Sequence, residues 1–201
     1  MKKKKTVLVT GGCGFIGTNL IDHLLAKKFN VINIDKISSI SNLRYKKDKK
    51  VHFIKNNLLN EKKLYEIFKK YNPNYLIHLA AETHVDRSID DSNDFIKSNI
   101  LGTYNLLQAC QKFLKNKKKK FKFVLMGTDE IFGDMDIKSK NGFTEKSCVN
   151  PNNPYSASKA SAINLGRAWF NTYDLPILFI NCSNNFGPFQ FYEKLIPTII
   201  F

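Results

Sequence analysis

Three glycines at G-x-x-G-x-x-G spacing stand directly after the first apolar run, and this feature constrains the fold more than any other. The run Thr6–Thr10 is rich in β-branched residues, as is typical of a strand, and Gly11, Gly14 and Gly17 lead from it into a helical pattern. The first glycine permits a tight turn, the second lets the backbone approach a pyrophosphate, and the third lets helix and strand pack closely. The first helical turn then offers unpaired N–H groups to phosphate oxygens. The turn therefore predicts a strand-turn-helix unit that binds a dinucleotide.

Short β-branched runs alternate with longer segments of helical period, the pattern of a parallel sheet with crossover helices. The predicted strands are 6–10, 31–35, 51–55, 74–80, 121–126 and 176–182, and the predicted helices are 17–27, 61–70, 92–114 and 154–173. The expected fold class is α/β, a Rossmann-type doubly wound parallel sheet with helices on both faces. One nucleotide-binding domain with the catalytic residues is expected over 1–188. The start of a truncated substrate-binding region is expected at 189–201, where an apolar stretch has no closing cap.

The net charge is strongly positive, at +15 over 201 residues, but arginine is scarce. The sequence has only Arg44, Arg87 and Arg167, whereas arginine forks are the favoured readers of nucleic-acid phosphates and bases. The lysine runs 2–5 and 117–120 fit a solvated terminus and a solvated loop. Nucleic-acid binding is therefore not expected, although it remains the alternative of a different class.

The four cysteines, Cys13, Cys110, Cys148 and Cys182, show no Cys/His spacing of the kind that binds zinc, so no metal is expected. Their wide spacing favours a reducing compartment. The first ten residues lack the apolar core of a signal peptide, and no run approaches the length of a membrane span. A cytoplasmic protein without a membrane partner is expected.

An acidic residue at the end of the second predicted strand indicates which dinucleotide binds. Asp35 stands where a carboxylate can accept hydrogen bonds from the adenosine ribose hydroxyls and would repel a 2′-phosphate. Lys36 beside it weakens this electrostatic argument slightly. NAD is therefore predicted rather than NADP.

Two further clusters point to catalysis. Tyr155 and Lys159 lie at i and i+4 on one face of the helix that Pro154 begins, where the ammonium would lower the phenol pKa toward the range of a general base. Thr128, Asp129 and Glu130 follow the fifth strand, where ligand-facing residues of a doubly wound sheet belong. Either cluster alone could be a solvated helix face or a strand-ending turn. Together with the glycine turn they predict an acid and a base beside a redox centre.

At this point the sequence resembles the extended short-chain dehydrogenase family, and within it the dTDP-glucose 4,6-dehydratases. The resemblance covers essentially the whole chain and is carried by segments 11–17, 33–36, 78–88, 99–103, 128–130, 154–161 and 181–185. It implies oxidation of the sugar at C4, elimination of water across C5 and C6, and return of hydrogen to C6. In this scheme Tyr155, with Lys159 and Thr128, takes the 4-hydroxyl proton. Glu130 takes the C5 proton, and Asp129, hypothesised to be buried and neutral, protonates the leaving 6-hydroxyl.

The resemblance also implies the binding residues. Those expected to touch the cofactor are Gly11, Gly14, Phe15, Ile16, Gly17, Asp35, Lys36, Ser38, Asn57, Leu58, Ala80, Ala81, Ser98, Tyr155, Lys159 and Asn185. Those expected to touch a nucleotide-sugar substrate are Thr83, Thr128, Asn184, Lys194 and Leu195. Five positions depart from the family pattern. Asn57-Leu58 replaces Asp-Ile and could weaken NAD binding, Thr83 replaces a serine and keeps its hydroxyl, and Gly127 and Phe132 replace a serine and a tyrosine.

Several alternatives stay open. Family members are longer, and the part they have beyond residue 201 reads much of the nucleotide base, so a UDP-glucose 4,6-dehydratase is the nearest alternative. A 4-epimerase or a decarboxylase would share the cofactor site but is not expected to carry the acidic pair, and GDP-mannose dehydratases resemble a Thr-Ser-Glu pattern instead. A non-catalytic NAD-binding module is the alternative of another class. The resemblance further implies a homodimer through the two long helices.

Overall fold

The computed structural model describes residues 4–115, 120–135, 138 and 142–200. Six parallel strands form one sheet in the order β3-β2-β1-β4-β5-β6. The strands are β1 Thr6–Thr10, β2 Asn30–Asp35, β3 Val51–Lys55, β4 Tyr75–His78, β5 Lys122–Thr128 and β6 Ile177–Cys182. The predicted fold class is confirmed.

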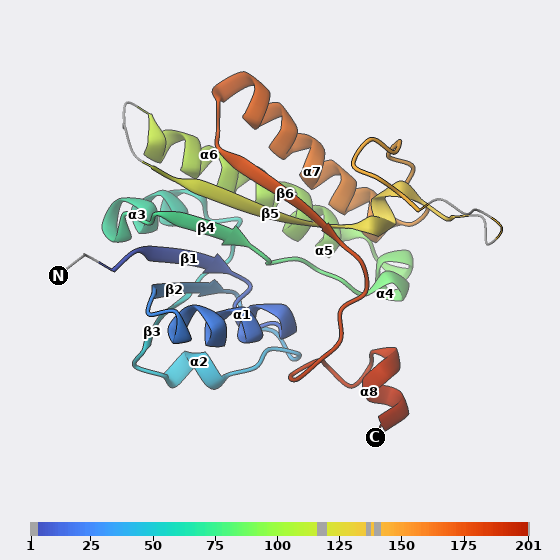
Figure 1. Cartoon of the computed structure of the whole chain (residues 1–201), viewed down its shortest axis with the longest axis horizontal. Coiled ribbons are helices and arrows are strands. Elements are labelled where there is room, and N and C mark those ends of the chain that lie inside the picture. The colour runs from blue at the N-terminus through green and yellow to red at the C-terminus, as the bar shows by residue number, and fades with distance from the viewer. Residues whose placement is uncertain (1–3, 116–119, 136–137, 139–141, 201) are drawn as a thin grey trace.

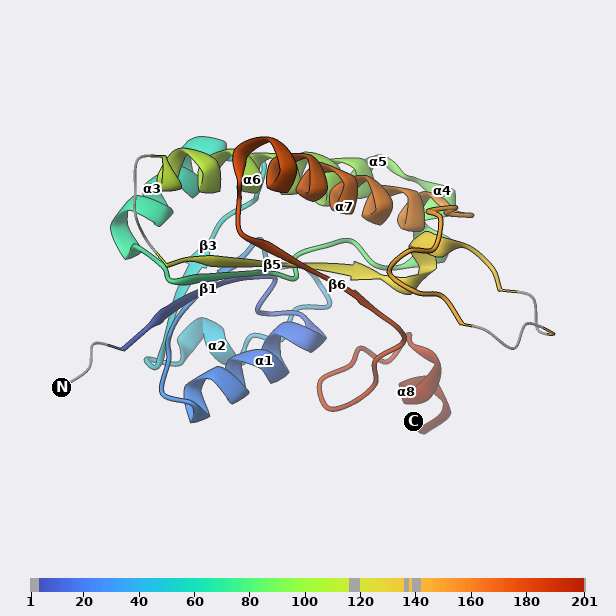
Figure 2. The ribbon, with the colours of Figure 1, turned by 45° about the horizontal axis from the view of Figure 1, so that its top comes forward.

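Helices cover both faces of the sheet (Figures 1 and 2). One face carries α3 Glu61–Tyr71, α6 Gly102–Leu114 and α7 Pro154–Tyr173, and the other carries α1 Phe15–Ala26 and α2 Arg44–Lys47. The remaining short elements are α4 Val85–Asp90, α5 Asn93–Phe95, η1 Ile96–Leu101, η2 Asp129–Phe132 and α8 Leu195–Ile200. The proposed division after residue 188 stays a prediction.

The alternation of side chains along the strands builds a core on each face. Leu8 of β1 points into the larger core, which it shares with Phe68 of α3 and Phe113 of α6. Its neighbours Val7 and Val9 point the other way, into the core beneath α1. Because strand residues alternate between faces, an apolar run such as that of β1 is expected only where both faces are covered.

Side-chain caps fix where the long helices begin. Asn60 accepts a hydrogen bond from the Lys63 N–H at the start of α3, and Asn153 accepts one from the Ser156 N–H at the start of α7. Pro154 occupies the first turn of α7, where its missing N–H costs nothing. The start of α7 is thereby fixed, which matters because Tyr155 lies there.

The segment predicted as one helix over 92–114 is interrupted. Its middle, η1, is a π-helical stretch between α5 and α6, and such insertions occur often at functional sites. It carries the buried Asn99, whose amide donates to the backbone carbonyl of Glu82 and to the Ser158 hydroxyl, while its oxygen accepts from the Glu82 N–H. The prediction of a uniform helix was therefore wrong in its centre. A π-helical turn holds about one residue more than an α-helical turn, and the spacing of apolar residues does not reveal such an insertion.

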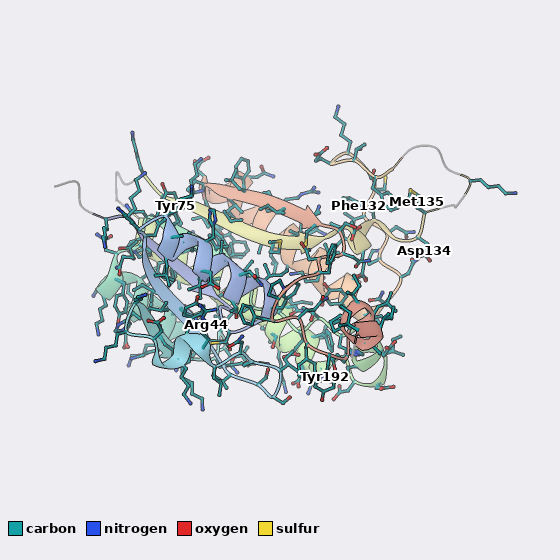
Figure 3. All side chains as sticks on the ribbon, turned by 60° about the horizontal axis from the view of Figure 1, so that its bottom comes forward. Arg44, Tyr75, Phe132, Asp134, Met135 and Tyr192 are labelled. Carbon is teal, nitrogen blue, oxygen red and sulfur yellow. The ribbon has the colours of Figure 1, made fainter. Side chains whose placement is uncertain are left out.

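Other boundaries also differ from the predictions. The first helix begins at Phe15 rather than Gly17, and β4 ends at His78 rather than Ala80. The short helices α2 and α4 were not predicted, because four and six residues are too few to show a helical period. Arg44 of α2 forms an ion pair with Asp22 of α1 at 3.3 Å, and Tyr45 donates to the same carboxylate. Figure 3 shows Arg44 near α1 and α2.

His78 ends β4 in the centre of the molecule and is buried. The Thr103 hydroxyl donates to the Asn99 carbonyl, so it accepts from His78 Nε2–H at 3.0 Å, and Nδ1 accepts from the Thr10 hydroxyl at 2.6 Å. The ring is therefore neutral, with its hydrogen on Nε2. Burial, assisted by the charge of Lys159, lowers the pKa of His78 from 6.5 to about 3.

This histidine is expected to make stability depend on pH. Because its pKa is lower in the folded chain, the unfolded chain binds the extra proton between pH 6.5 and about 3. The free energy of unfolding should therefore fall as pH falls through this window, by up to about 1.4 kcal/mol per pH unit from this residue. Urea unfolding at a series of pH values measures the slope. His78→Gln should flatten it, whereas His23→Gln, at an exposed position, should not; equal slopes in all three proteins would contradict the assignment.

Candidate active site at the carboxyl end of the sheet

The glycine turn lies where β1 separates β2 from β4. Thr10 at the end of β1 pairs with Ile34 of β2 on one side and with His78 of β4 on the other. The connections that follow β1 and its neighbours therefore lead away in opposite directions, and this leaves a crevice at the carboxyl end of β1. Gly11 has φ +73°, and a Cβ atom on it would lie 2.6 Å from the backbone nitrogen of Ala80. A Cβ atom on Gly17 would lie 2.2 Å from the Gly11 carbonyl oxygen. Both glycines are thus required by close backbone approach, as their spacing predicted.

The N-terminus of α1 faces this crevice without a competing anion. No side chain caps the helix, and its first turn has no acidic residue. A Cβ atom on Gly14 would contact only the Gly11 carbonyl oxygen, so that position is open to a ligand. The free N–H groups and the partial positive charge of the helix end fit a diphosphate.

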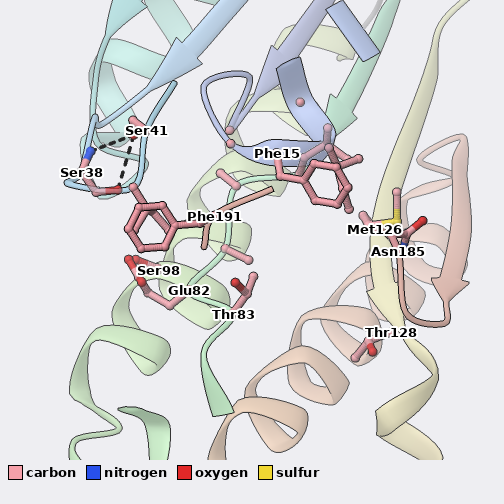
Figure 4. A pocket seen from close by; sticks show the side chains of 18 of the residues that line it. Phe15, Ser38, Ser41, Glu82, Thr83, Ser98, Met126, Thr128, Asn185 and Phe191 are labelled. Carbon is pink, nitrogen blue, oxygen red and sulfur yellow. Dashed lines mark hydrogen bonds between the residues drawn. The ribbon is translucent and has the colours of Figure 1, made fainter. Parts of the chain in front are cut away.

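A cavity of about 350 Å³ extends from the glycine turn to the start of α7. Every residue expected to touch the cofactor lines it, from the turn after β1, the ends of β2 and β3, the segment after β4, η1, α7 and the segment after β6. Figure 4 shows Phe15, Ser38, Ser98, Thr128 and Asn185 around this space. Residues far apart in the sequence are thus brought to one site, because the carboxyl ends of parallel strands share an edge.

The carboxylate of Asp35 is held in place by the backbone. One oxygen accepts from the Cys13 N–H at 2.9 Å and the other from the Ile37 N–H at 2.8 Å, which leaves lone pairs for ribose hydroxyls. The neighbouring Lys36 ammonium pairs with Glu82 at 2.5 Å. Because that charge is already compensated, Lys36 does little to favour a 2′-phosphate.

The departure at Asn57 has a visible consequence. Its amide oxygen accepts from the Leu59 N–H at 3.0 Å, so its NH₂ group is the part left to meet a ligand. An aspartate at this position would bring a second acceptor oxygen. The side chain therefore offers a donor where the family pattern offers an acceptor, which bears on recognition of the adenine amino group.

The end of β5 and the start of α7 bring the catalytic candidates together. Thr128, Glu130, Tyr155 and Lys159 line the same cavity. The Thr128 hydroxyl lies beside the Tyr155 phenol, where it only partly offsets the rise in the phenol pKa caused by burial and by the Glu130 charge. The Glu130 carboxylate accepts from the Ser156 hydroxyl at 3.2 Å, which holds it beside the cavity.

The expected effect of Lys159 on the phenol is not found. Burial, and next the negative charge of Glu130, raise the pKa of Tyr155 above its usual value. Lys159 donates instead to the Met126 carbonyl oxygen at 2.6 Å, and burial lowers the pKa of this ammonium to about 8. The structure therefore provides a protonated phenol, and the i, i+4 spacing alone did not predict the lysine's partner.

Two expected site residues lie outside the cavity lining. Asp129 is partly exposed and accepts from the Thr128 hydroxyl at 3.3 Å, so the hypothesis that it is buried does not hold. Leu195, expected at the substrate, is 75% exposed on α8. The other expected substrate residues, Thr83, Thr128, Asn184 and Lys194, do line the cavity.

The cavity also contains residues that sequence reasoning missed: Ile40, Ser41, Asn56, Leu79, Glu82, Met126, Gly127, Cys182, Ser183, Phe189, Gln190, Phe191 and Glu193. Most of them lie at the carboxyl end of a strand or in the segment that follows it, so the rule that ligands bind at carboxyl ends could have found them. Phe189, Phe191 and Glu193 had no such signal, because they lie well beyond β6. Among the described residues, no group of three or more metal-ligating side chains gathers, and no helix has the length and apolarity needed to span a bilayer.

The strand order and the glycine-lined cavity at its switch point define a Rossmann-fold protein with a dinucleotide-type site. Residues 8–201 match the family model described as GDP-mannose 4,6 dehydratase, and the chain belongs to this family. It is 43% identical to a dTDP-glucose 4,6-dehydratase of Haemophilus influenzae and 42% identical to one of Neisseria gonorrhoeae. The matches cover 96% and 98% of this chain but only 60% and 59% of those proteins. The chain thus spans about three fifths of the length of these relatives.

Solved structures agree with this placement. A dTDP-glucose 4,6-dehydratase from Streptomyces venezuelae, solved with NAD, superimposes with a TM-score of 0.86 at 33% identity, covering 97% of this chain and 61% of that one. A UDP-glucose 4-epimerase from Thermus thermophilus, also in complex with NAD, has a TM-score of 0.83 at 29% identity, covering 93% and 58%. The fold is therefore shared by dehydratases and epimerases, and the residues of the site must distinguish them.

Proposed function

We propose that this chain carries the NAD-binding and catalytic part of a nucleotide-sugar 4,6-dehydratase that acts on dTDP-glucose and forms dTDP-4-keto-6-deoxyglucose. One observation carries the proposal: Thr128, Glu130, Tyr155 and Lys159 line the same cavity as the dinucleotide cradle. A 4-epimerase needs the phenol and the cofactor but has no use for a carboxylate base at C5. The names of the relatives support the same reaction class.

The residues fit NAD. The open N-terminus of α1 suits the diphosphate, and Asp35 suits an unphosphorylated ribose. When bound, NAD would accept the hydrogen from C4 of the sugar and return it to C6. Everything else in the reaction is proton transfer and positioning by the chain.

Tyr155, which lies beside Thr128, would take the proton of the 4-hydroxyl as the phenolate, after its own phenol proton has been lost to solvent. The resulting C4 ketone makes the hydrogen on C5 acidic. Glu130, held by Ser156, would then remove the C5 proton. Asp129 is the proposed donor to the leaving 6-hydroxyl, and this role requires its side chain to turn from Thr128 into the cavity.

The dTDP label rests on the relatives, and UDP-glucose is the alternative substrate. Purified chain incubated with NAD and either nucleotide sugar tests both, because a 4-keto product develops an alkaline absorbance. Product from dTDP-glucose supports the proposal, whereas product from UDP-glucose alone would identify UDP-glucose as the substrate instead. A folded sample that binds NAD but gives neither product would contradict it and favour a non-catalytic NAD-binding module.

A homodimer is proposed as well. The inner faces of α6 and α7 belong to the core, as Leu106 and Ile163 show, whereas Tyr104 of α6 and Phe170 and Tyr173 of α7 are exposed. Figure 2 shows both helices side by side on the same face of the sheet. A second copy packing here would bury these rings. Light scattering checks the proposal, and a monomeric mass at high micromolar concentration would contradict it.

A further inference from the structure

The segment Phe186–Lys194, termed the strap, contributes Phe189, Gln190, Phe191, Glu193 and Lys194 to the lining of the cavity. Its first half is tied to the α1 and α2 side: Asn19 donates to the Pro188 carbonyl oxygen at 2.9 Å, and the Arg44 guanidinium lies 5.7 Å from the Phe189 ring centre. Phe191 lies within the cavity, in the direction of Ser38 and Ser98 (Figure 4). The strap is therefore part of the wall that a ligand must contact.

The second half of the strap is tied to α4, on the opposite side. An Arg87 nitrogen donates to the Glu193 carboxylate at 2.6 Å, and the Glu193 side chain is only 18% exposed. His84 caps the start of α4: its Nδ1 accepts from the Arg87 N–H, and its Nε2 lies 3.9 Å from the same carboxylate oxygen. The hydrogen bond from Arg87 to Glu193 is thus charge-assisted, and the His84 ring lies close to the same carboxylate.

The helix α4, which carries Arg87, is hydrogen bonded to the first turn of α7. The Ser88 hydroxyl donates to the Val85 carbonyl and accepts from the Tyr155 N–H at 3.1 Å, and this contact is buried. The element that holds Glu193 is therefore fixed to the residue proposed as the general base. Arg87 contacts the strap and not the glycine turn, so a substitution at Arg87 should alter the strap and leave the turn unchanged.

The pairing of Arg87 with Glu193 affects the charges of the residues that line the cavity. Among the lysines that line the cavity, Lys36 pairs with Glu82, and Lys159 donates to a backbone carbonyl. For Lys194, no ion pair is found within the described part of the chain, and its neighbour Glu193 is compensated by Arg87. The ammonium of Lys194 is thus left available to an anion.

We propose that Arg87 is a positioning residue: by pairing with Glu193 it fixes the strap and leaves Lys194 free to bind the diphosphate of the nucleotide sugar. The identity of the ligand in this inference rests on the proposed function. The contact between Arg87 and the strap is independent of that function, because both belong to this chain.

Charge reversal tests the pair. In Arg87→Glu, hydrogen exchange of strap amides should become faster, and the affinity for dTDP should fall roughly fivefold to tenfold at low ionic strength, because a half-exposed pair is worth little and reversal adds repulsion. NAD affinity should fall less than dTDP affinity, since the glycine turn and Asp35 are untouched and only the strap side of the cofactor cavity is loosened. The double variant Arg87→Glu with Glu193→Arg should recover both slow exchange and dTDP affinity. Arg167→Gln, an exposed arginine on α7, serves as the control.

Two results would overturn the proposal: an Arg87→Glu chain whose strap exchange and dTDP affinity match those of the control, or a double variant no better than the single one. Failure of the proposed function looks different. In that case the wild-type chain binds NAD without turning over dTDP-glucose, while the exchange experiment still decides whether Arg87 anchors the strap.

Discussion

Tyr155→Phe is expected to lower kcat for dTDP-glucose by about a thousandfold, the loss typical of removing a positioned general base. The phenol lies in the cavity beside Thr128, and Tyr155 is the only tyrosine among the described residues that line the cavity. NAD affinity should change by no more than about twofold, because the glycine turn and Asp35 are unaffected. The rate of 4-keto product formation and a direct titration of NAD binding measure the two effects.

Tyr65→Phe is the control, since this tyrosine lies on α3 and does not line the cavity. It should leave kcat unchanged. If Tyr155→Phe retained more than about a tenth of wild-type kcat while binding NAD normally, the phenol would not be the base. If NAD binding collapsed instead, the loss of activity would have a structural cause, and the assignment would fail on that ground.

The sequence predicted best what depends on local pattern. The period of apolar residues located the strands and long helices, because burial on one or two faces leaves a repeat that the chain itself displays. The glycine turn was predicted equally well. Gly11 and Gly17 must be glycines because a side chain at either position would clash with backbone atoms of the turn or of the adjacent segment. The edge at which the site would form followed from parallel strand order alone.

What sequence reasoning missed depends on contacts between distant segments. The pairing of Arg87 with Glu193 joins residues of a short helix and of a segment without regular structure, so no period or spacing signals it. The pKa of Tyr155 depends on its burial and on Glu130, which comes from another strand end, and the partner of Lys159 is a backbone carbonyl of β5. The direction of the Asp129 side chain, toward Thr128 rather than the cavity, is likewise a matter of tertiary placement.

Glu130→Gln should separate the two halves of the reaction. Glutamine keeps the shape and can still meet the Ser156 hydroxyl, but it cannot accept a proton, so elimination should slow by about a thousandfold. Oxidation at C4 depends on Tyr155 and should continue. Mixing the variant with NAD and dTDP-glucose should therefore produce absorbance of the reduced cofactor that persists, without the alkaline absorbance of the 4-keto-6-deoxy product.

The C5 hydrogen gives the decisive measurement. In deuterated water the wild-type chain should place solvent deuterium at C5 of the product, because the proton removed there is replaced from solvent. The Glu130→Gln chain should return sugar without deuterium at C5, whereas Glu145→Gln, at an exposed position, should behave as the wild type. Exchange at C5 that persists in Glu130→Gln would assign the base to another group, with Asp129 the nearest carboxylate in sequence. A wild-type chain that oxidises C4 without exchanging C5 would instead match the chemistry of a 4-epimerase, because epimerisation leaves that hydrogen in place.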